Sequence, residues 1–345
     1  MSRASRVPVS LPPAELDDYL ERGWYRVGSS LFTSRYLLSG GDIRSTVWTR
    51  SRLAGHSFGR NARRLLRQND RLLRRELRPA VGDPQREALY RRYVAHIGPG
   101  RSATLADFVS GGGSPEVFDT WELSFWSGDT LVAFSWFDRG RDALQSLIGV
   151  FDPGWAALSL GRYSLLCEVR LAIDEGRAYH YSGYVLPGDP KMDYKLSGGG
   201  IEFLDDRDSR WHPWAGFDPS QAPLERLRAR LLLARDGLNG RGMVSELLDN
   251  PAFDLPHFHE PLAHCSTEPL LLSVPTRQRG LNIVVTAPEG EEGYRVVVGQ
   301  LGSVVVSSSD SRVDDRTLPI WGCGQVMAEG IDLDELVGRF RRGVQ

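Results

Sequence analysis

Two lysines stand four residues apart in the segment Lys191-Met192-Asp193-Tyr194-Lys195, in a chain whose other basic side chains, histidines aside, are arginines. An arginine guanidinium is a planar fork that stays charged, whereas a lysine ammonium is a compact group that rotates freely and can give up its proton. Retention of lysine at these two positions indicates that Lys191 and Lys195 take part in chemistry. The alternative is chance retention on a solvated face.

The lysine pair closes a long segment that begins at Phe151, and the elements before it must position it. Hydrophobic alternation and turn residues predict the order β-β-β-α-β, with these strands and helix: Phe118–Trp126, Leu131–Asp138, Ala143–Phe151, the helix Leu158–Glu175 and the strand Ala178–Leu186. With a helix that crosses back, this is the order of a GNAT-type acyltransferase core, which uses the opening between its strands and the helix start as its acyl-donor site. The expected fold class is α+β, with a GNAT-like core of a mixed, mostly antiparallel sheet flanked by helices. Fold analogy alone does not establish a reaction.

A strongly basic stretch lies upstream of these strands. Between Arg50 and Arg78 the sequence holds ten arginines and two acidic residues, in a chain whose net charge is −2. Leucines at helical spacing predict one helix over Ser57–Leu77, with Ser57 as its N-cap. Arginines at this spacing can follow the phosphates of a polyanion. The alternative is a solvated face in an arginine-rich chain.

Composition excludes several classes of protein. The chain is 41% hydrophobic and 25% charged, as in an ordinary globular protein. Three widely spaced cysteines (Cys167, Cys265 and Cys323) argue against a disulfide framework and against a four-thiolate metal site. We find no apolar run long enough to span a membrane and no signal-type N-terminus, so a cytoplasmic protein without a membrane partner is expected.

A histidine cluster, His257, His259, His264 and Cys265, could bind zinc. Its spacing matches no closed tetrahedral pattern, and Pro256 and Pro261 make the segment a loop. Surface or packing histidines are therefore expected, and no metal site is predicted.

Three regions are expected: a basic N-terminal subdomain (14–110), the GNAT-like core (111–214) and a C-terminal accessory module (215–345). The glycine-rich stretch Gly111–Pro115 separates the first two. The first region should also hold short strands, among them Ile43–Leu53, and helices at Pro12–Leu20 and Pro84–His96. The predicted elements of the third region are a helix over Leu224–Leu238 that continues through Ser245–Leu248, strands at Leu281–Thr286, Tyr294–Gln300 and Val304–Ser308, and a terminal helix over Ile331–Phe340.

Several segments in this order resemble the arginyl-tRNA–protein transferases and their bacterial leucyl-transferring relatives, across residues 20 to 214. Each segment is weak alone, but their joint order is specific. The segments are Arg22-Gly23-Trp24-Tyr25-Arg26, the stretch from Phe58 to Asn69, Glu87 to Tyr93, Phe151-Asp152-Pro153 with Ser159-Leu160-Gly161, and Tyr181-Ser182-Gly183-Tyr184-Val185 leading to the lysine pair, with Trp211 downstream.

The resemblance implies aminoacyl transfer from a charged tRNA to the N-terminal amine of a protein or peptide, with arginine as the expected amino acid and leucine as the other candidate. The ester is already activated, so the enzyme must hold the tRNA end, position the acceptor and take up its surplus proton. The residues expected to contact tRNA are Arg52, Arg60, Arg63, Arg64, Arg67 and Asn69.

The resemblance also implies roles for the reacting centre. Lys191 and Lys195 would meet the terminal phosphate or ribose, or an acidic acceptor residue. Asp152 and Asp193 would pair with the incoming ammonium or an arginyl side chain. The remaining candidates are Tyr181 and Tyr184 for the ester carbonyl or terminal adenosine, Ser159 and Gly161 for substrate binding, and Glu168 as a base in the cleft or a salt-bridged structural residue.

The chain departs from this family in lacking cysteines before Cys167, where family members carry thiols implicated in a cluster or metal site. We therefore expect no iron–sulfur centre and no other cofactor besides the aminoacyl-tRNA co-substrate. Two other functions remain open. An acyl-CoA acetyltransferase needs a glycine-rich pyrophosphate loop, and Ser159–Tyr163 offers one glycine where two are usual. A non-catalytic RNA-binding protein would leave the lysine pair unexplained.

Overall fold

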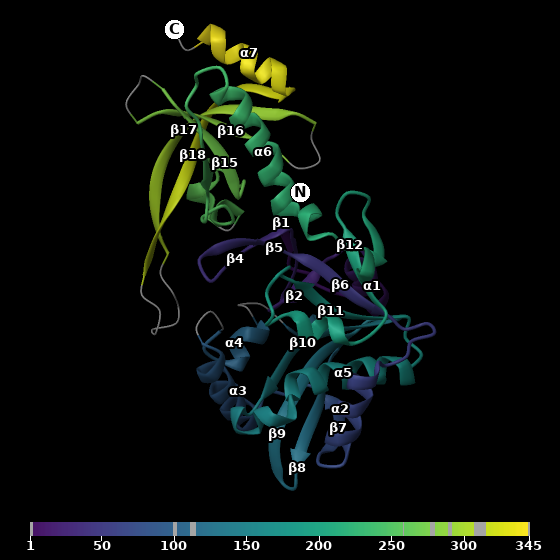
Figure 1. The fold of residues 1–345 in the computed structure, drawn as a ribbon. Coiled ribbons are helices and arrows are strands. Elements are labelled where there is room, and N and C mark those ends of the chain that lie inside the picture. Colours follow the sequence, from purple (N-terminus) through teal and green to yellow (C-terminus); the bar gives the residue numbers. More distant parts are fainter. Residues whose placement is uncertain are drawn as a thin grey trace.

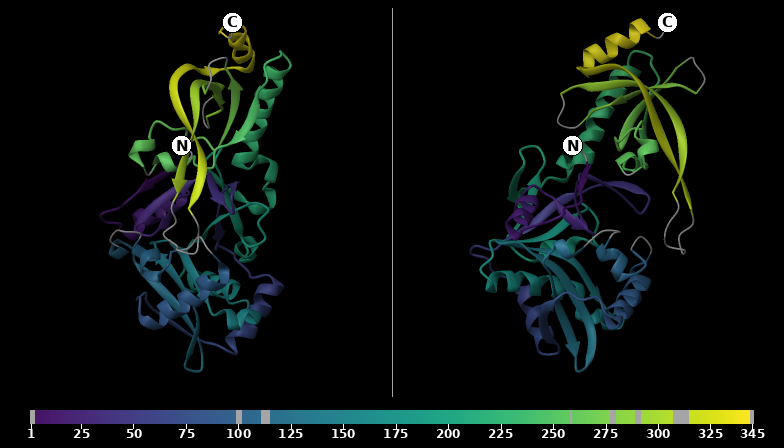
Figure 2. Two further views of the ribbon diagram at one scale, coloured as in Figure 1. Left: turned by 90° about the vertical axis from the view of Figure 1, so that its left-hand side faces the viewer. Right: turned by 180° about the vertical axis from the view of Figure 1, so that it is seen from behind.

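The computed structural model describes residues 3–98, 102–110, 115–257, 259–276, 280–288, 292–306 and 315–343. Within these ranges the chain is a mixed α+β protein whose sheets are mostly antiparallel, as expected. A lower body contains a large sheet flanked by helices, and a C-terminal module stands on one end of it (Figure 1 and Figure 2). Of the predicted linker, residues 111–114 lie outside the described part. The predicted boundaries between the three regions stay a prediction.

The large sheet runs in the order β13-β12-β6-β11-β10-β9-β8-β7 in the part of the chain that the structure describes. Its strands are β6 (Val47–Arg52), β7 (Arg74–Pro79), β8 (Thr120–Ser127), β9 (Thr130–Arg139), β10 (Ala143–Phe151), β11 (Tyr179–Val185), β12 (Ile201–Asp205) and β13 (Arg210–Pro213). Neighbouring strands are antiparallel except β10 and β11, which are parallel. The predicted β-β-β-α-β order is confirmed.

Two groups of helices cover the two faces of this sheet. Helix α5 (Leu160–Asp174) connects β10 to β11 and buries an apolar side in one core cluster, together with α2 (Arg60–Asp70) and side chains of β8 to β10. Helix α3 (Pro84–Ile97) buries Leu89, Tyr90 and Val94 against β9 and β10 in a second cluster, next to α4 (Leu105–Ser110). Because residues alternate between faces along each strand, both cores draw on the same strands. Hence these strands are almost entirely buried.

The basic segment differs from the prediction. The helix starts at Arg60, after Gly59 as N-cap, and ends at Asp70, whereas Ser57–Leu77 was expected to be one helix. Arg74–Pro79 is instead the edge strand β7, in which Leu77 faces Leu123 of β8. A leucine can satisfy either period, and pairing with a neighbouring strand overrides the helical spacing here. The excess of arginine therefore lies on a helix and on a sheet edge.

The N-terminal residues divide between the two parts of the molecule. Helix α1 (Pro13–Glu21) and the sheet β1-β3-β2 (Arg3–Arg6, Ser30–Ser34 and Tyr25–Val27) form a small layer that packs on the large sheet. The hairpin of β4 (Tyr36–Ser39) with β5 (Asp42–Ser45) instead buries Tyr36 and Ile43 in the core of the C-terminal module. Arg26 of β2 donates to Asp138 of β9 at 2.7 Å, and both side chains are fully buried. Because removing either partner would leave a buried charge, this ion pair fixes the layer to the sheet.

The C-terminal module is a sheet in the order β14-β15-β16-β17-β18 with two helices. Its elements are α6 (Pro223–Asn239), β14 (Glu246–Asp249), β15 (Leu270–Pro275), β16 (Asn282–Thr286), β17 (Tyr294–Val306), β18 (Arg316–Ile331) and α7 (Leu333–Gly343). The helices at 224–238 and 331–340 and the strand at 281–286 are confirmed. The helical continuation at 245–248 is wrong, because these residues enter strand β14. The two strands predicted within 294–308 are one strand over its described length, and β15 and β18 were missed.

Candidate functional site

The parallel strands β10 and β11 separate along their length. They pair at three positions, the last of which joins Gln145 to Tyr181. Beyond that pair, β10 continues along β9 to Phe151 and β11 continues along β6 to Val185. Each strand also has a register irregularity just after the last pair. Such bulges bend a strand and redirect its side chains. We call this place the strand fork.

Glu168 of α5 lies at the strand fork, on the sheet face that α5 covers, and is fully buried. Ser135 and Ser146 donate to its Oε1, the latter at 3.3 Å, and Nε2 of His180 lies 2.9 Å from its Oε2. The carboxylate thus joins α5 to β9, β10 and β11. Nδ1 of His180 is buried without a hydrogen-bond partner among the described residues. Glu168 was expected to be either a base in the cleft or a salt-bridged structural residue. In the structure its carboxylate is fully buried and bonded to His180 and two serines.

Tyr25 of β2 lies beside the strand fork, although the sequence predicted no role for it other than as part of the Arg22–Arg26 segment. A β-carbon on Gly183 would lie 3.0 Å from its Cε2 and 3.3 Å from its hydroxyl oxygen. Burial raises the pKa of the Tyr25 phenol well above its usual value, and the charge of Glu168 adds to the shift. Asp138, Tyr184 and Tyr194 also raise this pKa.

A row of polar side chains crosses the opposite face at the level of the last pair. Adjacent strands contribute Asp138, Gln145, Tyr181, Arg50 and Glu202, each paired with the next. Arg50 donates to Glu202 at 2.7 Å and to the hydroxyl of Tyr181 at 3.1 Å. Both atoms of the Gln145 carboxamide are buried without a partner in the described ranges, and so is Oδ2 of Asp138. Tyr181, Arg50 and Glu202 are thus linked by hydrogen bonds, and the Gln145 side chain beside them makes none in the described residues.

Tyr181 is held within this row rather than facing open space. Its hydroxyl donates to Glu21 of α1 at 3.1 Å and accepts from Arg50, and its ring lies 5.6 Å from that of Trp211. Burial raises its pKa, although Arg50 opposes the shift. A phenol with both hydrogen-bonding directions occupied is suited to positioning. Its predicted catalytic role stays a prediction.

The lysine pair lies where β11 leaves the sheet, and its two members differ. Nζ of Lys195 donates to the carbonyl oxygen of Tyr184 at 2.9 Å and lies 5.3 Å from the centre of that ring. Lys191 is exposed, and its side chain contacts no acidic residue that the structure describes. Asp193 is also exposed and begins the short helical turn η3 (Asp193–Ser197). Lys195 therefore braces the motif, whereas Lys191 and Asp193 face solvent.

Three other predicted residues shape the start of α5. The carboxylate of Asp152 caps the turn η2 (Pro153–Leu158) through the amide of Gly154 and accepts from Arg92 at 2.9 Å. Ser159 has a φ of 50°, between η2 and α5, and its side chain makes no capping bond. Gly161 packs on Phe151, whose ring would lie 3.4 Å from an added β-carbon. Asp152 is thus already paired, and the others set the backbone path.

The residues predicted to contact tRNA divide into two kinds. Arg52, Arg60, Arg63, Arg64 and Arg67 are exposed, the last four on α2. Asn69, on the same helix, is fully buried and donates to the carbonyl oxygen of Leu158 at 2.8 Å. In this structure Asn69 therefore joins α2 to the turn before α5 instead of facing solvent.

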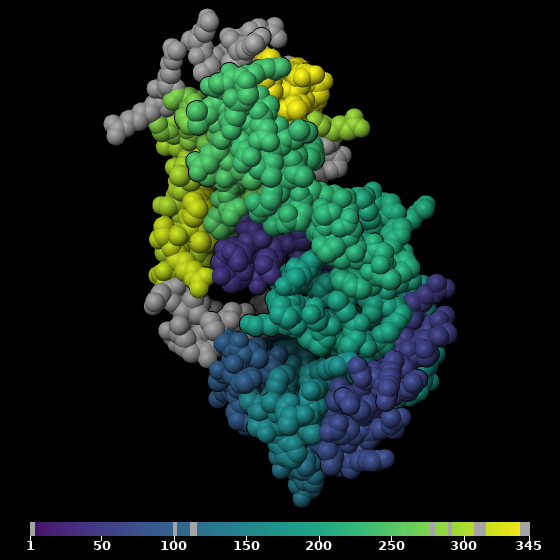
Figure 3. All heavy atoms as spheres, in the orientation of Figure 1, coloured from purple at the N-terminus to yellow at the C-terminus, as the bar shows by residue number. Residues whose placement is uncertain are grey.

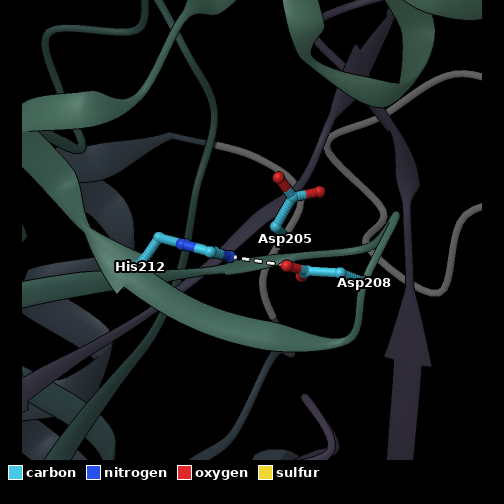
Figure 4. A group of neighbouring side chains, drawn as sticks. All are labelled: Asp205, Asp208 and His212. Atoms are coloured by element: carbon cyan, nitrogen blue, oxygen red, sulfur yellow. Dashed lines mark hydrogen bonds and ion pairs between the residues drawn. The ribbon is translucent and has the colours of Figure 1, made fainter.

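The described side chains offer one group with metal-ligand geometry: Asp205, Asp208 and His212, in the β12–β13 hairpin (Figure 4). Arg207 holds both oxygens of Asp205 and lowers its pKa, and His212 bonds to Asp208 at 2.9 Å. These contacts explain the cluster as a brace of the hairpin. The histidine cluster is outside this geometry, although Sγ of Cys265 lies 3.6 Å from Nε2 of His264.

A cavity of about 450 Å³ is lined by residues of β6 and β12 and of the segment that leads into α6. Trp48, Phe203 and Phe217 form its apolar wall, and Arg35 and Asp206 lie at its polar side, 3.3 Å apart. The Trp48 ring also contacts those of Tyr25 and Tyr184, at 5.8 and 5.5 Å between ring centres. Figure 3 shows a separate hollow on the surface, between the lower body and the C-terminal module, with N-terminal strands (purple) visible in it.

Comparison with known proteins identifies the family. Residues 85–205 match the family model described as "Arginine-tRNA-protein transferase, C terminus". The chain is also similar to three proteins named aspartate/glutamate leucyltransferase. The one from Hyphomonas neptunium is 36% identical and is covered over 64% of its length by 46% of this chain. The one from Ruegeria pomeroyi is 30% identical, over 62% of its length and 48% of this chain. The one from Xanthomonas euvesicatoria pv. vesicatoria is 34% identical, over 70% of its length and 49% of this chain.

The chain therefore belongs to the aminoacyl-tRNA–protein transferase family, a family of aminoacyltransferases. It spans less than two thirds of the length of the first two relatives. Among solved structures, the C-terminal domain of a protein named as a lysylphosphatidylglycerol synthetase from Agrobacterium fabrum has a TM-score of 0.34 at 12% identity. The match covers 45% of this chain and 51% of the other chain, and this similarity is too low to support an argument. In the described residues, no helix is long and apolar enough to cross a membrane.

Proposed function

We propose that this protein transfers a leucyl group from leucyl-tRNA to the α-amine of an N-terminal aspartate or glutamate of an acceptor protein or peptide. The observation that carries the proposal is that residues 85–205, matched by the family model, contain both strands of the fork, helix α5 and both lysines. The relatives are leucyltransferases by name. Their names do not support the sequence-based preference for arginine, so leucine replaces it.

The proposed reaction places the ester of the charged tRNA at the strand fork. A diverging parallel pair joined by a helix is the feature expected of a GNAT-like core, in which the acyl donor enters between the strands. Lys191 lies at the exposed end of the motif and is suited to the terminal phosphate or to the acidic side chain of the acceptor. Asp193, which is exposed in the same motif, would hold the α-amino group of the acceptor.

The exposed arginines of α2 supply the matching surface for the tRNA backbone. Arg60, Arg63, Arg64 and Arg67 face solvent on one short helix next to α5. Guanidinium groups release counterions from phosphates when they bind, so the expected binding depends strongly on salt. Leucyl-tRNA as co-substrate also implies a cytoplasmic location. No further cofactor is proposed.

The test offers labelled amino acids, carried by a mixed pool of charged tRNA, to peptides that begin with Asp, Glu, Lys or Arg. Acetyl-CoA runs in parallel as the competing donor. RNase-sensitive transfer of leucine to the Asp and Glu peptides is expected. Transfer of arginine would correct the donor, labelling from acetyl-CoA alone would indicate an acetyltransferase, and binding of tRNA without labelling would indicate a non-catalytic RNA-binding protein.

A further inference from the structure

The hydroxyl of Tyr25 lies beside the strand fork and, among the residues that the structure describes, takes no part in holding the fold together. It makes no hydrogen bond with any residue that the structure describes, whereas Glu168, Tyr181 and Lys195 are each bonded to neighbouring elements. Tyr25 is half-buried, and its hydroxyl is not among the buried polar atoms that lack a partner in the described residues. The hydroxyl is therefore open to a hydrogen bond with water or with a ligand.

The surrounding structure holds this side chain against the fork. The ring lies 5.8 Å from that of Trp48 and 6.5 Å from that of Phe32, centre to centre. Gly183 has a φ of +86°, and any β-carbon there would collide with the ring and crowd the hydroxyl at 3.3 Å. A glycine at this position therefore serves two purposes: it allows the backbone conformation and it allows Tyr25 to reach the strand.

The environment also determines the protonation state of the Tyr25 hydroxyl. Burial and the neighbouring carboxylate of Glu168 raise the pKa of the phenol well above its usual value. It therefore keeps its proton at neutral pH. A group of this kind donates a hydrogen bond and does not transfer its proton in the reaction.

We infer that the Tyr25 hydroxyl is a catalytic hydrogen-bond donor to the carbonyl oxygen of the aminoacyl ester in the strand fork. This inference rests on the proposed transferase function. The neutral acceptor amine attacks the ester carbonyl carbon, a C–N bond forms, and the negative charge that develops on the carbonyl oxygen is held by the Tyr25 hydroxyl. The tetrahedral intermediate then collapses with cleavage of the bond to the ribose oxygen. The attacking nitrogen loses a proton and the ribose oxygen gains one.

The test compares Tyr25→Phe with Tyr179→Phe in steady-state transfer from leucyl-tRNA to a peptide that begins with Asp. Both changes remove one oxygen atom and keep the ring, and the Tyr179 ring retains its contact with Arg50 at 3.8 Å. Tyr25→Phe is expected to lower kcat roughly 100-fold, the effect of losing one donor to an oxyanion, with both KM values nearly unchanged. Tyr179→Phe is expected to keep the wild-type kcat. Thermal unfolding checks that both variants fold like the wild type.

Several outcomes would overturn the inference. An unchanged kcat in Tyr25→Phe, or a raised KM at unchanged kcat, would show that the hydroxyl does not act in the transition state. An equal loss in both variants would show a general sensitivity of the sheet to the loss of a hydroxyl. If the wild-type protein transfers no amino acid from any charged tRNA, the proposed function fails, and the role of Tyr25 fails with it. If the wild type is active and the variant matches it, the role of Tyr25 alone fails.

Discussion

Oε2 of Glu168 and Nε2 of His180 lie 2.9 Å apart at the strand fork, and both side chains are fully buried. Since Ser135 and Ser146 donate to the other carboxylate oxygen, the carboxylate receives donors from three strands. The contact therefore joins the crossing helix to the strands beside the position where they separate.

Glu168→Gln should destabilise the protein. The amide presents two N–H groups to neighbours that themselves donate, so at least one buried donor loses its acceptor, at a cost of about 1–3 kcal/mol in the free energy of unfolding. Urea unfolding measures this cost, and the transfer rate should fall with it. Ser146→Ala is the matched control, with a smaller expected cost because its contact with Glu168 is 3.3 Å long. Equal effects of the two changes would contradict the assignment.

Replacement of both Lys191 and Lys195 with methionine should abolish transfer while leaving the fold intact. The single variants should differ in stability. Lys195→Met removes a bond to the Tyr184 carbonyl and should cost about 1 kcal/mol, whereas Lys191→Met should leave the free energy of unfolding unchanged. Transfer assays and thermal unfolding separate the two effects. Unchanged transfer by the double variant would reject a role for the pair.

Glutamine at Arg60, Arg63, Arg64 and Arg67 together should weaken tRNA binding and flatten its dependence on salt. The slope of log affinity against log salt should fall by roughly one for each arginine that contacts a phosphate. Filter binding at several salt concentrations gives this slope. Glutamine at Arg228 and Arg235 of α6 is the matched control and should change neither affinity nor slope. A slope that stays at the wild-type value would exclude α2 from the tRNA surface.

The buried Glu122 should make the protein sensitive to acid. Burial raises its pKa, but Arg86, Ser124 and Trp136 outweigh that effect and hold it below the usual value. A lowered folded-state pKa means that the carboxylate stabilises the protein above the unfolded pKa of about 4.3. This stabilisation is lost as the pH falls through the pKa that Glu122 has in the folded protein. Glu122→Gln should cost about 3 kcal/mol at neutral pH, because Arg86 keeps a buried charge.

Urea unfolding between neutral and acidic pH tests this prediction. The wild type should lose stability on acidification, and Glu122→Gln should lose less over the same range. Glu76→Gln is the control, since Glu76 is 41% exposed at the sheet edge and should leave the acid profile unchanged. Parallel curves for the wild type and Glu122→Gln would contradict the linkage.

Local patterns were sufficient to predict the core of the fold. Strands β8 to β11 and helix α5 alternate between polar turns and apolar runs of distinct period, so sequence indicated both their type and their order. Strand β15 was missed because Leu270–Pro275 is a short apolar run without alternation, and such runs fit a buried helix or strand equally well. The split of the basic segment depended on pairing with β8, which no local pattern contains.

The candidate site was predicted where its residues are close in sequence. Glu168, Tyr181 and the lysine motif lie within one continuous segment, although the side chains of Glu168 and Tyr181 lie on opposite faces of the sheet. Tyr25 reaches the site from the far N-terminus, so only the fold could place it there. Gln145 and His180 carried a weaker signal, as isolated polar residues in otherwise apolar strands. The tRNA contact predicted for Asn69 stays a prediction, and in the structure its side chain donates to a backbone carbonyl.

The position of β6 in the large sheet has a consequence for folding of the protein during its synthesis. Val47–Arg52 lies between β11 and β12, which the ribosome makes much later. Until then β6 has neither neighbour, and its strand edges are open to pairing with other chains. Contacts so distant along the chain also form slowly. We therefore expect nascent chains that stop before residue 205 to be bound by chaperones, and longer chains, in which β11 and β12 can pair with β6, to be released from them.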